Sequence, residues 1–153
     1  MRIESIAVSR KKGTPKMVVD EARIEAGHGI VDDAHAGAWH RQISFLASER
    51  ITRARQEGLD VDFGSYAENI ATSGIDWPAV PVGTRLNLGN TVTVEITQIG
   101  KSCHRKCAIY YQAGECIMPK QGVFGKVITG GTIYPGDAIH FLDAEGNAME
   151  TCR

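Results

Sequence analysis

Three of the four cysteines of this chain lie within residues 98–118, among several cationic side chains. The thiols are Cys103, Cys107 and Cys116, and the nearby cationic groups are Lys101, His104, Arg105 and Lys106. A thiol acts as a nucleophile or as a sulfur carrier only when it is a thiolate, and neighbouring positive charge favours that form. This cysteine segment is therefore the first place in the sequence to look for chemistry.

Cys103 is the cysteine best placed to react. Ser102 before it is a good helix N-cap, and the sequence predicts a helix from about Ser102 to Gly114. The unpaired N–H groups and the partial positive charge of that helix end would favour a thiolate at Cys103. We therefore predict Cys103 to be a nucleophile or the acceptor of a persulfide sulfur, with Cys116 as a resolving thiol or second carrier.

The residues alone leave other roles for the thiols open. Cys107 follows Cys103 at i+4 and could be a buried core residue, because free cysteine is among the most buried side-chain types. A reversible disulfide among Cys103, Cys107 and Cys116 is another alternative. A zinc site normally uses two close ligand pairs, and the second pair is missing here, so no metal is assigned. Cys152 is interpreted as an incidental exposed thiol.

Residues 28–42 form a second polar segment, rich in histidine and aspartate. Loops of this length are more often functional than not. Arg41 directly follows His40, and a guanidinium group suits phosphate or carboxylate. We predict that His35, His40 and Arg41, together with Lys101, bind an anionic ligand.

A carboxylate and an amide, Glu68 and Asn69, stand side by side before an apolar segment. Glu68 is a candidate general base or a group that orients one, and an exposed carboxylate at a strand end is the equally favoured alternative. Asn69 is assigned to ligand binding. His104 is the other candidate for moving a proton.

The composition narrows the classes of protein to consider. The chain has 153 residues, 42% hydrophobic and 23% charged, which fits a single domain over residues 1–153. A formal net charge of −1 argues against nucleic acid or an anionic membrane as a partner. No apolar run reaches the roughly 20 residues of a membrane span, and the first residues do not resemble a signal peptide. We expect a cytoplasmic protein with reduced thiols.

The elements that must position these residues are mainly strands. Glycines recur between short segments rich in valine, isoleucine and threonine, which is typical of all-β folds. The clearest strand covers residues 91–99, with Gly89-Asn90 as a turn that pairs it with residues 83–88. Further strands are expected at Ile3–Ser9, Met17–Ile24, Gln42–Ala47, Ala67–Thr72, Lys126–Thr129 and Ala138–Leu142. Residues 130–137 are expected to be a turn-rich stretch.

Besides the helix at the cysteine segment, one more helix is expected, with Ser48 as its N-cap and Gly58 as its stop. The connections are too short for repeated helical crossovers between parallel strands. The predicted fold is mainly β, a closed and mostly antiparallel barrel with two or three short helices.

Six motifs occur in an order that resembles the MOSC family, named after the carboxyl-terminal domain of molybdenum cofactor sulfurase. They are Asp33-Ala34-His35-Ala36-Gly37, His40-Arg41-Gln42, Ala67-Glu68-Asn69-Ile70, Pro81-Val82-Gly83-Thr84, Gln98-Ile99-Gly100-Lys101-Ser102-Cys103-His104, and Gly130-Gly131 with Pro135-Gly136-Asp137. The resemblance implies a β-barrel that handles reactive sulfur, with the essential cysteine at Cys103. One departure is Asp32, where the family often has glycine.

The resemblance also implies ligands and partners. In the sulfurases a separate pyridoxal-phosphate domain makes a persulfide, and the MOSC domain binds the pterin cofactor. We expect a standalone member that contains no pyridoxal phosphate and no tightly bound cofactor. A molybdenum or tungsten pterin cofactor is a candidate ligand of such a protein. A persulfide donor or a molybdoenzyme is the expected partner, and an oligomer is compatible with the sequence. Some standalone members are implicated in reducing N-hydroxylated bases.

Two functions compete on this basis. In the first, the Cys103 thiolate transfers sulfur or cleaves a carbon–sulfur bond of a small anionic substrate. In the second, the chain is a non-catalytic module that binds the pterin cofactor or an oxyanion and delivers it to an apo-enzyme.

Overall fold

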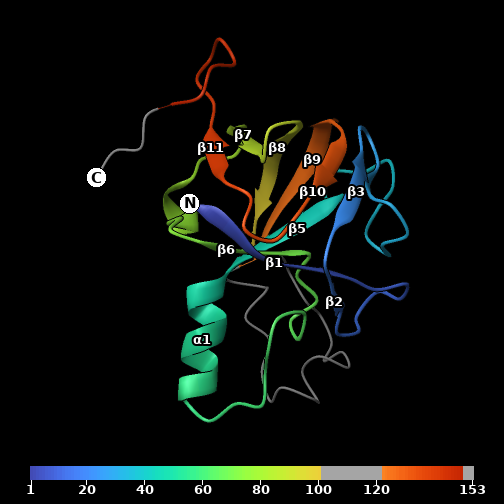
Figure 1. The fold of residues 1–153 in the computed structure, drawn as a ribbon, viewed down its shortest axis with the longest axis vertical. Coiled ribbons are helices and arrows are strands. Elements are labelled where there is room, and N and C mark those ends of the chain that lie inside the picture. Colours follow the sequence, from blue (N-terminus) through green and yellow to red (C-terminus); the bar gives the residue numbers. More distant parts are fainter. Residues whose placement is uncertain (101–121, 150–153) are drawn as a thin grey trace.

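A computed structural model describes residues 1–100 and 122–149 of the chain. Within these ranges the chain forms an eight-stranded sheet, a three-stranded sheet and one α-helix (Figure 1). The large sheet has the order β11-β7-β8-β9-β5-β6-β1-β2 and the small sheet the order β10-β3-β4. The strands are β1 (Arg2–Val8), β2 (Met17–Val19), β3 (Ala22–Glu25), β4 (Gly29–Ile30), β5 (Ile43–Ala47), β6 (Ile70–Ser73), β7 (Arg85–Leu88), β8 (Val92–Ile99), β9 (Val123–Thr129), β10 (Gly131–Ile133) and β11 (Ile139–Phe141). The helices are α1 (Ser48–Gln56) and the 3-10 turn η1 (Trp77–Ala79).

The mainly β, mostly antiparallel prediction is confirmed. Strands β5 and β6 pair in parallel through the crossover that contains α1, and the other named strand pairs are antiparallel. The predicted hairpin is β7–β8, and Gly89 in its turn has φ +64°, a conformation that favours glycine.

Closure into a barrel is not supported, because the large sheet has two edges, β11 and β2. The start of β1 approaches β11 through one isolated bridge, Arg2 with Ala138, and not through a ladder. The edge of β11 that faces away from β7 already makes another hydrogen bond, since the backbone N–H of Met149 donates to the carbonyl of Phe141 at 2.7 Å.

Several predicted strands have different bounds in the structure; for example, β9 begins at Val123 and not at Lys126. The segment Met17–Ile24 is divided at Asp20 and Glu21, both exposed, because β2 joins the large sheet and β3 the small one. The strand expected from Ala67 begins only at Ile70, since Ala67 has φ +62° and interrupts the extended chain. Within the turn-rich stretch 130–137, residues 131–133 form β10 and pair with β3.

Helix α1 has a different first turn from the one predicted. Ala47 is its N-cap, without a side-chain capping bond, and Ser48 is already helical. The carboxyl end agrees with the sequence: Gly58 has φ +94°, and its N–H donates to the carbonyl of Arg55 at 3.0 Å. The N–H of Leu59 donates to the carbonyl of Ala54, which completes a Schellman motif. The second expected helix lies outside the described residues.

Side chains of β5 pack on both faces of the large sheet. Ile43 and Phe45 belong to the main core, which also contains Ile24, Ile30 and Ile133 of the small sheet. Leu46 belongs to a second core, in which Ile51 and Ala54 of α1 pack with Tyr66, Ala71 and Phe124. Because β5 is covered on both sides, the loop between β4 and β5 ends at a strand that is held firmly in the core. No helix in the described ranges has the length and apolar character needed to cross a membrane.

Candidate functional site

The loop between β4 and β5 is anchored by a buried carboxylate, Asp33. Its Oδ1 accepts from Lys16 Nζ at 2.8 Å and from the Ser9 N–H at 3.1 Å, and its Oδ2 accepts from the His35 N–H at 3.1 Å. Burial alone would raise the pKa of Asp33, but the hydrogen bond and the charge of Lys16, together with hydrogen bonds from Ser9 and Asn69, outweigh it and lower that pKa. Asp33 therefore holds the loop against the end of β1.

Lys16 is a site residue that sequence reasoning missed. Its side chain and that of Asp33 are both fully buried, 0% exposed. Lys16 Nζ also donates to Ser9 Oγ at 3.1 Å, and its backbone N–H donates to the carbonyl of Gly64 at 2.8 Å. A lysine after Pro15 in a polar stretch carries no sequence signal of burial, so only the fold identifies this partner.

His35 and Trp39 lie directly on this anchor. His35 Nδ1 is 3.8 Å from Asp33 Oδ2, and the His35 carbonyl accepts from Trp39 Nε1 at 2.7 Å. Two cationic groups lie close to the Trp39 ring, with Lys12 Nζ at 4.6 Å and Arg41 Cζ at 4.5 Å from its centroid. The structure thus brings two of the predicted anion-binding residues, His35 and Arg41, to one aromatic ring.

His40 connects the same loop to the end of β8. Its Nε2 and Gln98 Oε1 are 2.7 Å apart, its carbonyl accepts from Thr97 Oγ1, and its ring packs edge-on against Trp39. Gln98 Nε2 in turn donates to the carbonyl of Gly100 at 2.6 Å. The predicted anion-binding loop is therefore fixed beside Gly100, the residue that follows β8 and precedes Lys101.

The two ends of the undescribed segment lie next to each other. The N–H of Gly100 donates to the carbonyl of Gly122 at 2.6 Å, and Ile99 pairs with Val123 in the β8–β9 ladder. The predictions for Lys101, Cys103, His104, Cys107, Cys116 and Cys152 lie outside the described residues. Cys103 follows Gly100 by three positions in the sequence.

Glu68 is buried, so the alternative of an exposed strand-end carboxylate is wrong. Only 1% of the residue is exposed, and its carboxylate accepts from the N–H of Gly64 at 2.5 Å and from the N–H of Tyr66 at 3.2 Å. Burial raises the pKa of Glu68 to about 7 against the opposing effect of these hydrogen bonds. A carboxyl group of this kind can hold or release a proton near neutral pH, as a general base must.

Asn69 has its side chain committed to the fold. Its Oδ1 accepts from the N–H of Ser44 at 3.0 Å, and its Nδ2 donates to the carbonyl of Ala7 at 3.1 Å. It therefore links β5 and β1, the two neighbours of β6, and ligand binding by Asn69 stays a prediction. In the described ranges, no three His, Cys, Asp or Glu side chains gather in an arrangement that could hold a metal ion.

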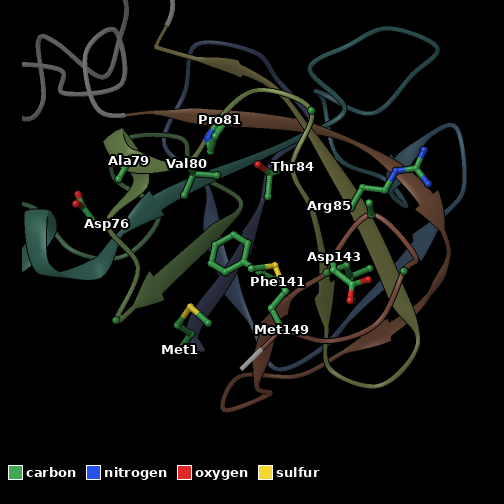
Figure 2. Close-up of a pocket in the computed structure, with 15 residues that line it drawn as sticks. Met1, Asp76, Ala79, Val80, Pro81, Thr84, Arg85, Phe141, Asp143 and Met149 are labelled. Carbon is green, nitrogen blue, oxygen red and sulfur yellow. The ribbon is translucent and has the colours of Figure 1, made fainter. Parts of the chain in front are cut away.

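Two pockets differ in their relation to these residues. A pocket of about 430 Å³ is lined by Arg10, His28, Asp32, Asp33 and Ala34, so it opens onto the anchor of the loop. A pocket of about 760 Å³ lies by β7 and β11 (Figure 2). Its described lining includes Met1, Phe141 and Met149 and none of the predicted site residues. The smaller pocket is also lined by none of the predicted site residues, but it borders Asp33, which anchors the loop that carries His35, His40 and Arg41.

Residues 32–140 match the family model of the MOSC domain. The chain belongs to the MOSC domain family. The match covers most of the sequence and includes the Asp33 anchor, Arg41, Glu68 and the cysteine segment. The family is associated with functions related to molybdenum cofactor sulfurase.

Solved structures agree with this MOSC assignment in fold. The YUAD protein from Bacillus subtilis is 19% identical and has a TM-score of 0.72, with 90% of this chain and 93% of that chain covered. YiiM from Geobacillus stearothermophilus is 20% identical, with a TM-score of 0.71 and coverage of 93% and 75%. YiiM from Escherichia coli is 18% identical, with a TM-score of 0.66 and coverage of 97% and 73%. No curated protein matches this MOSC chain in sequence.

Proposed function

We propose that this MOSC protein is a cysteine-dependent enzyme or carrier that handles sulfur on a small anionic substrate. The observation that carries the proposal is the tie between His40 and Gln98. It fixes the cationic loop of His35 and Arg41 beside Gly100, and Cys103 follows Gly100 closely in the sequence. Family membership supports the same chemistry, because the MOSC name derives from a cofactor sulfurase.

The proposed reaction begins at the thiolate of Cys103. The thiolate attacks the outer sulfur of a donor persulfide, the sulfur–sulfur bond of the donor breaks, and the donor leaves as a thiol after taking up a proton. Cys103 then carries the persulfide. Attack of the Cys116 thiolate on the Cys103 sulfur breaks the sulfur–sulfur bond, forms a Cys103–Cys116 disulfide and releases the outer sulfur to the acceptor as sulfide; a small cellular thiol then reduces the disulfide. Glu68 or His104 moves the proton, and Cys116 serves as a second thiol.

The proposed acceptor is a molybdenum or tungsten pterin cofactor or another small anionic molecule, bound through Arg41, His35 and Lys101. Cleavage of a carbon–sulfur bond in a small thioether by the same thiolate belongs to this proposal. The donor is a separate protein or a small persulfide, and the protein needs no pyridoxal phosphate of its own. We place the reaction in the cytoplasm, where thiols stay reduced.

A binding module without catalysis is the competing function. It is favoured by Arg41, whose Nε is buried and has no hydrogen-bond partner in the part of the chain that the structure describes. A cofactor phosphate would supply such a partner. In this alternative the cationic residues matter and the thiols do not.

Mass spectrometry after exposure to a small persulfide distinguishes the two functions. We expect the wild type to gain one sulfur atom, mapped to Cys103 by peptide analysis, and Cys103→Ser to gain none at that position. Cys152→Ser is the matched control and should behave as the wild type does. Sulfur uptake that is equal in Cys103→Ser and the wild type would contradict the sulfur-transfer proposal and favour the binding module.

A further inference from the structure

The side-chain amide of Gln98 can take only one orientation. One of its polar atoms lies 2.6 Å from the carbonyl oxygen of Gly100, and the other lies 2.7 Å from His40 Nε2. A carbonyl oxygen accepts hydrogen bonds and donates none, so the atom beside Gly100 is the amide nitrogen of Gln98. The amide oxygen of Gln98 therefore faces His40.

This amide oxygen fixes the tautomer of His40. It has no proton to donate, so the hydrogen of the 2.7 Å contact is carried by His40 Nε2. In a neutral imidazole the other ring nitrogen then holds a lone pair, which makes His40 Nδ1 an acceptor. Within residues 1–100 and 122–149, no group donates a hydrogen bond to this nitrogen, and His40 is exposed.

The histidine is also held in place from several sides. Thr97 Oγ1 donates to the carbonyl of His40 and to that of Phe124, so the backbone at His40 is tied to β8 and β9. The ring packs edge-on against Trp39, with the centroids 5.9 Å apart. Because Gln98 also lies on β8, the direction of Nδ1 is set by groups of the sheet before any substrate is bound.

His40 is more accessible to a reacting group than Glu68, the other candidate base in the described ranges. Both carboxylate oxygens of Glu68 already accept backbone N–H groups, from Gly64 at 2.5 Å and from Tyr66 at 3.2 Å, and only 1% of the residue is exposed. The Nδ1 lone pair of His40 is not used in this way. It is therefore the better placed of the two to accept a proton from a reacting molecule.

We propose that His40 is the catalytic residue that takes the proton of the reacting thiol, and that Gln98 is the positioning residue that presents Nδ1 for this transfer. The sulfur–hydrogen bond breaks, the proton passes to Nδ1, and the electron pair stays on sulfur as the thiolate with which the reaction begins. The exposed imidazolium then gives the proton to solvent. Nucleophile, base and a group that orients the base are the usual parts of such a site.

This inference rests on the proposed function for the identity of the thiol, Cys103. Gln98 connects His40 to Gly100 through two hydrogen bonds. Cys103 follows Gly100 by three positions, a distance of at most about 11 Å along an extended chain. A proton acceptor fixed beside Gly100 is thus close in the chain to the thiol that it would serve.

Nitrogen-15 spectroscopy of the histidine rings tests the tautomer. At a pH where histidine is neutral, we expect His40 to carry its proton on Nε2, and loss of the signal in His40→Ala assigns it. In Gln98→Leu, which has no acceptor for this proton, the fraction of the other tautomer should rise toward that of a free histidine. A neutral His40 that carries its proton on Nδ1 in the wild type would overturn the proposal.

The pH dependence of Cys103 alkylation by iodoacetamide tests the proton transfer. The reaction needs the thiolate, and peptide mass spectrometry assigns it to Cys103. His40→Ala should raise the midpoint of this profile by about one pH unit, which slows alkylation at pH 7 about tenfold. His140→Ala removes an exposed histidine on β11 and should keep the wild-type profile. Equal profiles for His40→Ala and His140→Ala would overturn the proposal.

Gln98→Leu separates positioning from a general structural effect. The substitution should raise the midpoint in the wild-type background and change nothing in His40→Ala, because Gln98 acts through His40. A rise of equal size in both backgrounds would contradict the positioning role.

Iodoacetamide transfers no sulfur, so the two proposals can fail separately. If Cys103 takes up sulfur from a persulfide but His40→Ala leaves the alkylation profile unchanged, only the role of His40 is wrong. If His40→Ala raises the midpoint but Cys103 takes up no sulfur, only the sulfur-transfer proposal is wrong.

Discussion

Glu68 is the residue whose environment has the clearest consequence for solution behaviour. Burial raises the pKa of Glu68 from 4.5 to about 7. Between pH 4.5 and pH 7, Glu68 therefore keeps its proton in the folded protein but has lost it in the unfolded chain. The contribution of Glu68 to stability is therefore most favourable below about pH 4.5 and falls as the pH rises through 7. The change corresponds to about 3 kcal/mol.

Comparison with Glu68→Gln measures this dependence. The free energy of unfolding of the wild type, minus that of the variant, should decrease between pH 5 and pH 8, as followed by urea denaturation. The amide cannot ionise, so the variant lacks the dependence that is specific to Glu68. Parallel stability curves for the two proteins would mean that Glu68 titrates near its ordinary pKa.

At the scale of elements, substitutions at the two ends of α1 should lower the free energy of unfolding by different amounts. Ser48→Ala should lower the free energy of unfolding by less than about 0.5 kcal/mol, because Ser48 does not cap the helix; a capping serine would cost about 1 kcal/mol. Gly58→Ala should cost about 1 kcal/mol, since φ +94° is unfavourable for a residue with a Cβ atom. Chemical denaturation of the two variants checks both values. A larger effect at Ser48 than at Gly58 would contradict this description of the helix ends.

Strand pairing shows how far periodicity predicts an element. The alternation of Val92, Val94 and Ile96 identified β8, and the glycine turn identified its partner β7, because both signals are local. Local signals do not reveal which strands lie at an edge. Asp20 and Glu21 interrupt one apolar segment where it passes from one sheet to the other, and nothing in the spacing distinguishes this from a continuous strand.

At the scale of the molecule, the buried pair of Lys16 and Asp33 joins the β1–β2 loop to the loop before β5. Lys16→Met should lower the free energy of unfolding by about 3–5 kcal/mol, because it leaves Asp33 charged and buried. Adding Asp33→Asn should recover about 1 kcal/mol or more, since the remaining amide carries no charge. Urea denaturation of the single and double variants measures both effects.

An exposed ion pair supplies the control for that experiment. Arg53 and Glu57 are 3.2 Å apart at i and i+4, with side chains 68% and 59% exposed. Arg53→Ala should change the free energy of unfolding by less than about 0.5 kcal/mol. If Lys16→Met costs no more than Arg53→Ala, the buried pair does not hold the two loops together.

The sequence predicts which side chains of the site can carry chemistry. It does not predict the burial of these side chains or the residues that they contact. Arg41 and His35 were assigned together from residue type, and the structure places both at Trp39. The burial of Glu68 and the partner of Asp33 depend on contacts between segments far apart in the chain. Sequence patterns carry no information on such contacts, so Lys16 was missed and one of the two interpretations of Glu68 was wrong.

The backbone hydrogen bond between Gly100 and Gly122 has a consequence for divergence among related chains. Residues 101–121 leave and rejoin the scaffold at adjacent positions of one ladder, where Ile99 pairs with Val123. An insertion or deletion between these two points does not change the register of β8 and β9. Related chains can therefore differ in the length and sequence of the thiol-bearing segment. The strands β8 and β9 that support this segment remain under the constraints of core packing.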